Sequence, residues 1–81
     1  MEREIETMLT MDGQASTLQW IYQELRKRGC TFEWRGAPYE RKFAVVRENR
    51  ILAEANARSD FYRMKTGLLQ ARTVLGIQPR R

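Results

Sequence analysis

The spacing of apolar residues in the first third of the chain predicts two amphipathic helices. A first apolar stripe lies within residues 1–12 and a second within residues 16–28, each with the three- and four-residue spacing of a helix face. Gly29 ends the second helix, because glycine accepts the left-handed conformation of a helix stop. The first stripe consists of Ile5, Met8 and Leu9, and the second of Leu18, Ile21, Tyr22 and Leu25.

The middle of the chain changes to a period of two. Phe32 and Trp34 alternate with polar residues, which is typical of a half-buried strand. Residues 36–38 (Gly-Ala-Pro) predict a turn, and residues 42–46 are rich in β-formers. We expect a β-hairpin over residues 31–46, with a helix as the alternative for its second half, because periodicity does not distinguish the two in so short an apolar run.

Residues 48–76 are helical in character and end at Gly76. Within them, an apolar seam repeats with spacings of three and four residues, and a frayed basic tail is expected at 77–81. Gly67 interrupts the seam at a cost of about 1 kcal/mol relative to Ala, which suggests close approach to another helix in the same chain or in a second copy. A homodimer through the helix Phe61–Leu75 is therefore one hypothesis. The seam consists of Phe61, Met64, Leu68, Ala71 and Leu75.

These elements predict a mainly α single domain of three to four helices with one short hairpin, or an all-α fold as the alternative. A chain of 81 residues has room for one core, and a composition of 42% hydrophobic and 31% charged residues is typical of a globular domain. No apolar run approaches the roughly 18 residues of a membrane span, and the first residues do not resemble a signal peptide. We expect a cytoplasmic protein that has no membrane partner.

Missing residue types exclude most catalytic chemistry. The chain has one cysteine and no histidine, so it forms neither an internal disulfide nor a structural zinc site of about four Cys or His ligands. Ser-His-Asp and Cys-His catalysis both need an imidazole, and no glycine-rich phosphate loop is present. We expect no enzymatic activity, no cofactor and no metal, and we interpret Cys30 as a small buried hydrophobe.

The charge is divided unevenly along the chain. The net charge is −4 over residues 1–25 and +9 over residues 26–81. A basic body favours an anionic partner, either DNA or an acidic protein surface. Alternatively, the acidic first part folds back and neutralises some of the basic part.

Basic residues interleaved with aromatics suggest nucleic-acid binding, because cations contact phosphates and rings stack on bases. A basic hairpin at 31–46 is one candidate element. A second is a stripe of three cations at seven-residue intervals on one helix. In the alternative interpretation, the rings close the core and the cations are solvated. The candidate nucleic-acid-binding residues are Arg26, Lys27, Arg28, Arg35, Arg41, Lys42, Arg58, Lys65 and Arg72.

A second function class is a protein-binding adaptor or antagonist. Trp20 lies off the apolar stripe of its helix, and Trp is enriched among interface hot spots. With Trp34 and Tyr39 it forms the candidate partner-binding set. Size, arginine content and lack of catalytic residues are compatible with the small accessory proteins of phages and mobile elements, which bind host factors, including factors of DNA replication or transcription.

Overall fold

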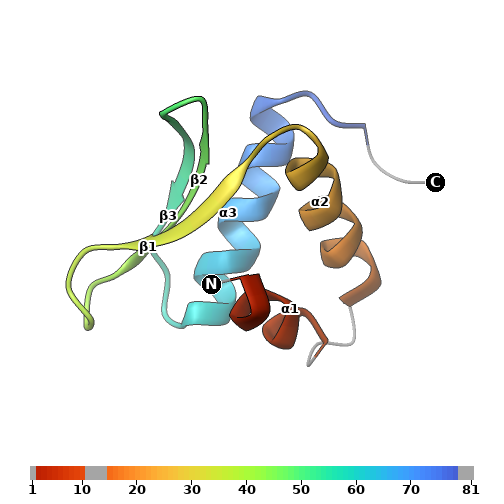
Figure 1. Ribbon diagram of the computed structural model, residues 1–81. Helices are drawn as coiled ribbons and strands as arrows, with labels where there is room; N and C mark the ends of the chain where they lie inside the picture. The colour runs from red at the N-terminus through yellow and green to blue at the C-terminus, as the bar shows by residue number, and fades with distance from the viewer. Residues whose placement is uncertain (1, 11–14, 79–81) are drawn as a thin grey trace.

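The computed structural model describes residues 2–10 and 15–78 and shows an α+β fold. Within these residues, three helices pack to one side of a three-stranded antiparallel sheet (Figure 1). The expectation of a mainly α domain, and its all-α alternative, are therefore wrong. The elements are α1 (Glu2–Thr10), α2 (Ala15–Lys27), β1 (Thr31–Arg35), β2 (Lys42–Arg47), β3 (Arg50–Ala55) and α3 (Asp60–Val74).

The sheet is a simple meander in the order β1-β2-β3. Its first two strands form the hairpin expected over residues 31–46, with Phe32 opposite Val45 and Trp34 opposite Phe43. The third strand lies where a helix was expected, since residues 50–55 belong to the predicted helical half 48–76. A register shift between Val45 and Val46 interrupts the pairing of β2 with β3.

The third strand escapes prediction because its residues are good helix formers. Ala53, Glu54 and Ala55 favour a helix when taken alone. In the fold they alternate, with Ala53 and Ala55 buried against α3 and Glu54 on the other face. Small alanines at these positions allow α3 to approach the sheet closely, so tertiary packing outweighs the intrinsic propensity. The chain leaves β3 and begins α3 afresh, with the Ser59 hydroxyl accepting a hydrogen bond from the Tyr62 amide.

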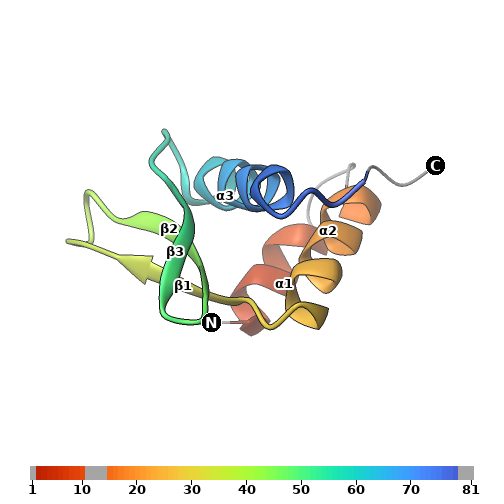
Figure 2. The ribbon, with the colours of Figure 1, turned by 90° about the horizontal axis from the view of Figure 1, so that it is seen from above.

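Helices α2 and α3 lie on one side of the sheet, and α1 packs beside α2 (Figure 2). Phe43 of β2 lies at the centre of the core and is fully buried, with Phe32 stacked at 6.1 Å. A Cβ added to Gly67 would lie 2.7 Å from Phe43 Cδ2. The close approach expected at Gly67 therefore exists, but the neighbour is a strand of the same chain and not another helix.

The apolar seam of α3 is used inside the molecule. Met64, Leu68 and Ala71 are fully buried, and Phe61 and Leu75 are half-buried against the same core. The seam is thus covered without a second copy of the chain. None of the described helices is both long and apolar enough to cross a membrane.

Both α2 and α3 end in the same glycine motif. The amide of Cys30 donates to the carbonyl of Leu25, five residues back, and the amide of Ile77 donates to Arg72 in the same way. The residues after Gly29 and Gly76 are thereby turned into the core, where Cys30 and Ile77 are buried. Of the other expected bounds, residues 11–12 of the first helix and 79–81 of the basic tail lie outside the described residues.

Candidate functional site

The outer face of the sheet carries a neutral set of four charged side chains. Arg35 pairs with Glu33 on its own strand and with Glu54 on β3, where the Nε–Oε2 distance is 3.6 Å. Lys42 also pairs with Glu54, at 3.6 Å. Ala44, opposite Glu33 and Glu54 in the register, is fully buried beneath them. Two of the predicted nucleic-acid contacts, Arg35 and Lys42, therefore already meet carboxylates.

Arg41 joins the first hairpin to the helices. Its guanidinium donates to both oxygens of Asp60, with Nε 3.1 Å from Oδ1, and lies 3.6 Å from Glu4. Its Cζ lies 4.1 Å from the ring centroid of Trp34, a cation–π contact. The hydrogen bond from Arg41 lowers the pKa of Asp60, with Arg63 adding to the effect. Arg41 therefore connects the first hairpin to α1 and α3, whereas the sequence predicted that it would be available to contact nucleic acid.

The three cations at the end of α2 are also paired. Glu24 accepts from Arg28 at 3.0 Å and from Lys27 at 3.1 Å, and these bonds, that of Arg28 first, lower the pKa of Glu24. Arg26 lies 3.9 Å from Glu6 of α1. The expected folding back of the acidic first part thus occurs at two places, Glu6–Arg26 and Glu4–Arg41.

The predicted stripe of three cations on one helix does not form. Arg58 lies in the loop between β3 and α3, because α3 begins only at Asp60. There it lines a shallow hollow with Ala57, Tyr62 and Thr66. Lys65 and Arg72 are both on α3 and both half-buried.

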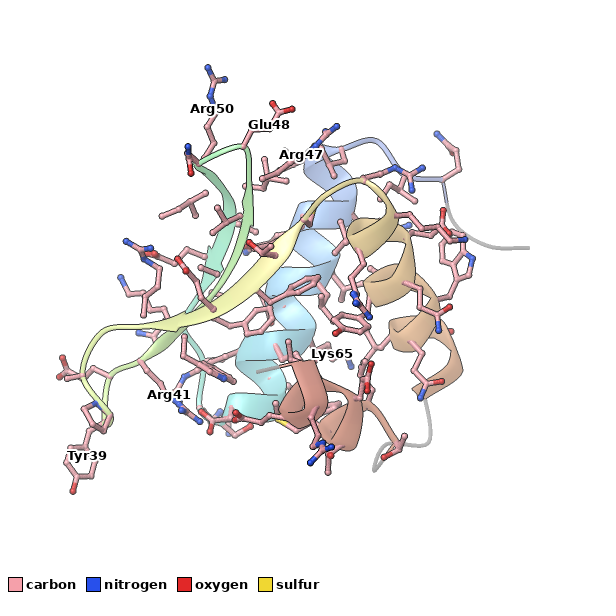
Figure 3. The ribbon with its side chains drawn as sticks, viewed as in Figure 1. Tyr39, Arg41, Arg47, Glu48, Arg50 and Lys65 are labelled. Atoms are coloured by element: carbon pink, nitrogen blue, oxygen red, sulfur yellow. The ribbon has the colours of Figure 1, made fainter. Side chains whose placement is uncertain are left out.

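Arg47 and Arg50 are unpaired among the described residues, as Arg58 is, and unlike Arg58 they were not among the predicted contacts. They are Cα partners across the turn that joins β2 to β3. No described carboxylate lies within the 4.0 Å that defines an ion pair for either of them. Residues 47–50 are called the β2–β3 tip below. Figure 3 shows Arg50 pointing away from the body of the molecule, and Arg47 on the side of α3.

The turn at this tip is short and rigid. Glu48 and Asn49 are its only two central residues, with φ of 53° and 63°. Two left-handed residues in succession are the arrangement of a type I′ turn, whose twist matches that of the flanking strands. The turn thus holds Arg47 and Arg50 on adjacent strands, about 5 Å apart in the pairing direction.

Further basic residues lie at the same end of the molecule. The C-terminal ends of α2 and α3 lie at the same end of the molecule as the tip, both to one side of it in Figure 1, and they carry Arg28 and Arg72. Arg47 and Arg28 are both near enough to Cys30 to favour its thiolate, although burial has the larger effect and raises the pKa of that thiol. The Arg72 Nε is buried without a hydrogen-bond partner among the described residues.

The three candidate partner-binding aromatics have different environments. Trp20 is half-buried and packs against the core from α2. Trp34 is also half-buried, with its ring edge-on to Phe43 at 5.2 Å. Tyr39, in the loop between β1 and β2, is 95% exposed.

Neither a search for metal ligands nor comparison with known proteins identifies a further site. The described residues contain no group of three or more Cys, Asp or Glu side chains able to hold a metal ion. Comparison of the chain with protein-family models, curated proteins and solved structures finds no match.

The sequence contained one signal for the turn at the β2–β3 tip. Glu48-Asn49 separates two runs of residues that are compatible with strands, and Asn tolerates a positive φ.

Proposed function

We propose that this protein is a small cytoplasmic, non-enzymatic regulatory module that associates with DNA through the β2–β3 tip. The observation that carries the proposal is the pair Arg47–Arg50, directly opposite in the register and without an ion pair to any described carboxylate. Like charges directly opposite on neighbouring strands destabilise a hairpin. An anionic partner removes this repulsion, so the unbound tip is suited to phosphate.

The outer face of the sheet shows how such a pair is compensated within the chain. Arg35 and Lys42 are also directly opposite cations, but Glu54 lies 3.6 Å from each. Nothing described plays the part of Glu54 at the tip. A backbone phosphate supplies anionic oxygens, and charge-assisted bonds from arginine to phosphate are among the strong hydrogen bonds.

The surrounding charge supports a contact with several phosphates. Arg72 is at the same end of the molecule as the tip, and so is Arg28, although its guanidinium is already bonded to Glu24. Phosphate contacts from such residues fix affinity and orientation on a duplex.

The test is fluorescence anisotropy of a labelled duplex over a salt series. We expect a negative slope of log affinity against log salt, at about 0.9 for each phosphate contact. Arg47→Gln with Arg50→Gln should weaken binding and reduce the slope by about 1 for each arginine. The control, Arg35→Gln with Lys42→Gln, removes the same net charge from cations that are already paired.

Equal losses in the two double variants would mean that only the overall charge attracts DNA, and would reject the tip as the contact. Absence of binding by the wild-type protein at low salt would reject DNA association itself.

The second candidate is the protein-binding adaptor or antagonist, and Tyr39 favours it. A ring that is 95% exposed on a loop is available to anchor a protein partner. A photo-crosslinking residue placed at Tyr39 should then give one discrete adduct in extract, and the same residue at Arg50 should not. No adduct, or the same adducts from both positions, would remove this candidate.

A further inference from the structure

We infer that the β2–β3 tip reads base edges in the major groove of duplex DNA. The inference rests on the proposed association with DNA and adds the kind of contact that the tip makes. It is carried by the types of the four side chains at the tip, by their exposure and by the width of the element that presents them.

The four tip positions hold residue types that pair with bases. Arginine pairs through two hydrogen bonds with guanine, asparagine does the same with adenine, and a carboxylate accepts from the amino group of cytosine. The tip presents Arg47, Glu48, Asn49 and Arg50 in succession. Glu48, Asn49 and Arg50 are exposed, and Arg47 is half-buried.

The carboxylate of Glu48 distinguishes base reading from simple phosphate binding. A negative side chain at the point of contact repels the backbone of DNA, so an element that only bound phosphates would lose affinity by carrying it. Glu48 makes no ion pair or hydrogen bond with any described residue, so Arg47 and Arg50 do not neutralise it. Its oxygens are therefore available to a donor such as the amino group of cytosine.

The shape of the tip agrees with this use. The major groove of B-DNA is about 12 Å wide and admits a two-stranded ribbon. The tip is the end of such a ribbon: two central residues close it, and the pair Arg47–Arg50 lies just beyond Val46, the last residue of β2 that pairs with β1. The helix ends that carry Arg28 and Arg72 lie at the same end of the molecule as the tip, and contacts from there to phosphates would set its register.

The experiment selects duplexes from a randomised DNA pool with the full-length protein and then measures affinity for matched sequences. We expect an enriched sequence that contains C and G, and discrimination of roughly tenfold for each base contacted by one side chain. Glu48→Ala should abolish the preference at one cytosine and tighten binding to other sequences.

The matched control is Glu40→Ala. Glu40 is an exposed acid in the other turn, between β1 and β2, and its removal makes the same change in net charge. It should raise affinity slightly for all duplexes and leave the selected sequence unchanged.

The outcomes separate the two proposals. Binding without an enriched sequence, or a preference that Glu48→Ala leaves intact, would overturn base reading while DNA association stands. Preference for A-form RNA would also overturn it, because the major groove of RNA is too narrow for a ribbon. No binding to any duplex would overturn both.

Discussion

The two hairpins of the sheet share strand β2, and each has two cations at directly opposite positions in the register. In the first hairpin, Arg35 lies opposite Lys42, and Glu54 from the third strand reaches both at 3.6 Å. In the second, Arg47 lies opposite Arg50, and no described carboxylate reaches either. The first pair is neutralised within the fold, and we propose that the second binds an anionic partner.

The comparison also shows why a count of cations is a poor guide to an interface. The first hairpin, residues 31–46, is the more aromatic in sequence and has as many cations as the second, yet each of its three cations meets an acid in the structure. Arg41 is the clearest case, because it binds Asp60, Glu4 and the ring of Trp34 together. Such a side chain is already committed, and binding a phosphate would require it to give up these contacts.

The largest expected effect comes from the strand that both hairpins share. Phe43→Ala should lower the free energy of unfolding by about 3–5 kcal/mol, since it removes a fully buried ring from the centre of the core. Urea unfolding followed by tryptophan fluorescence measures this loss. A loss below about 1 kcal/mol would mean that the two hairpins do not depend on one core, and would contradict the assumption on which their comparison rests.

Arg41→Ala should lower the free energy of unfolding by about 1–2 kcal/mol, because it removes hydrogen bonds to a carboxylate and a cation–π contact at a partly exposed site. Thermal or urea unfolding measures the loss. The control is Arg58→Ala in the following loop, where no described carboxylate pairs with the arginine. Equal effects of the two variants would contradict the bridging role of Arg41.

The same bridge predicts a dependence of stability on pH. Arg41 holds the pKa of Asp60 below its ordinary value of 3.8, so the unfolded chain takes up a proton at a higher pH than the folded one. The stabilisation is complete above that ordinary value and is lost as pH falls through the folded pKa. The free energy of unfolding, measured from pH 6 down to pH 2, should depend less on pH in Asp60→Asn than in the wild type. Glu24, whose pKa is also lowered, accounts for part of the dependence that remains.

These contacts mark the limit of what the sequence reveals. The alternation of Phe32 and Trp34 is a local signal, and it predicted the first hairpin. The pair Arg41–Asp60 joins residues 19 positions apart, and no local pattern encodes such a contact. The third strand was not predicted because Ala53 and Ala55 favour a helix unless α3 packs on them. Without that strand, the turn that places Arg47 opposite Arg50 could not be predicted either.

A smaller effect is expected when the first hairpin is made to resemble the second. Glu54→Gln removes the shared carboxylate and leaves Arg35 opposite Lys42 without it. We expect a loss of stability of about 0.5–1 kcal/mol and tighter binding of duplex DNA, since two cations on the sheet become available. Anisotropy and urea unfolding on the same preparation measure both. Unchanged DNA affinity would show that freeing a cation pair does not by itself create a contact.

The smallest change in stability, and the most informative sign, is expected at the tip. Arg50→Gln keeps the first part of the aliphatic stem and a polar end, and it removes the positive charge and with it the repulsion from Arg47, so the free energy of unfolding should stay the same or rise by up to about 0.5 kcal/mol. Affinity for duplex DNA should fall in the same variant. Arg35→Gln is the matched control, with a small loss of stability and little change in affinity. If Arg50→Gln instead destabilised the fold, Arg50 would be a structural residue and the contrast between the hairpins would fail. A variant that gains stability and loses DNA affinity is the expected result for a side chain that destabilises the free protein and contributes to binding its ligand.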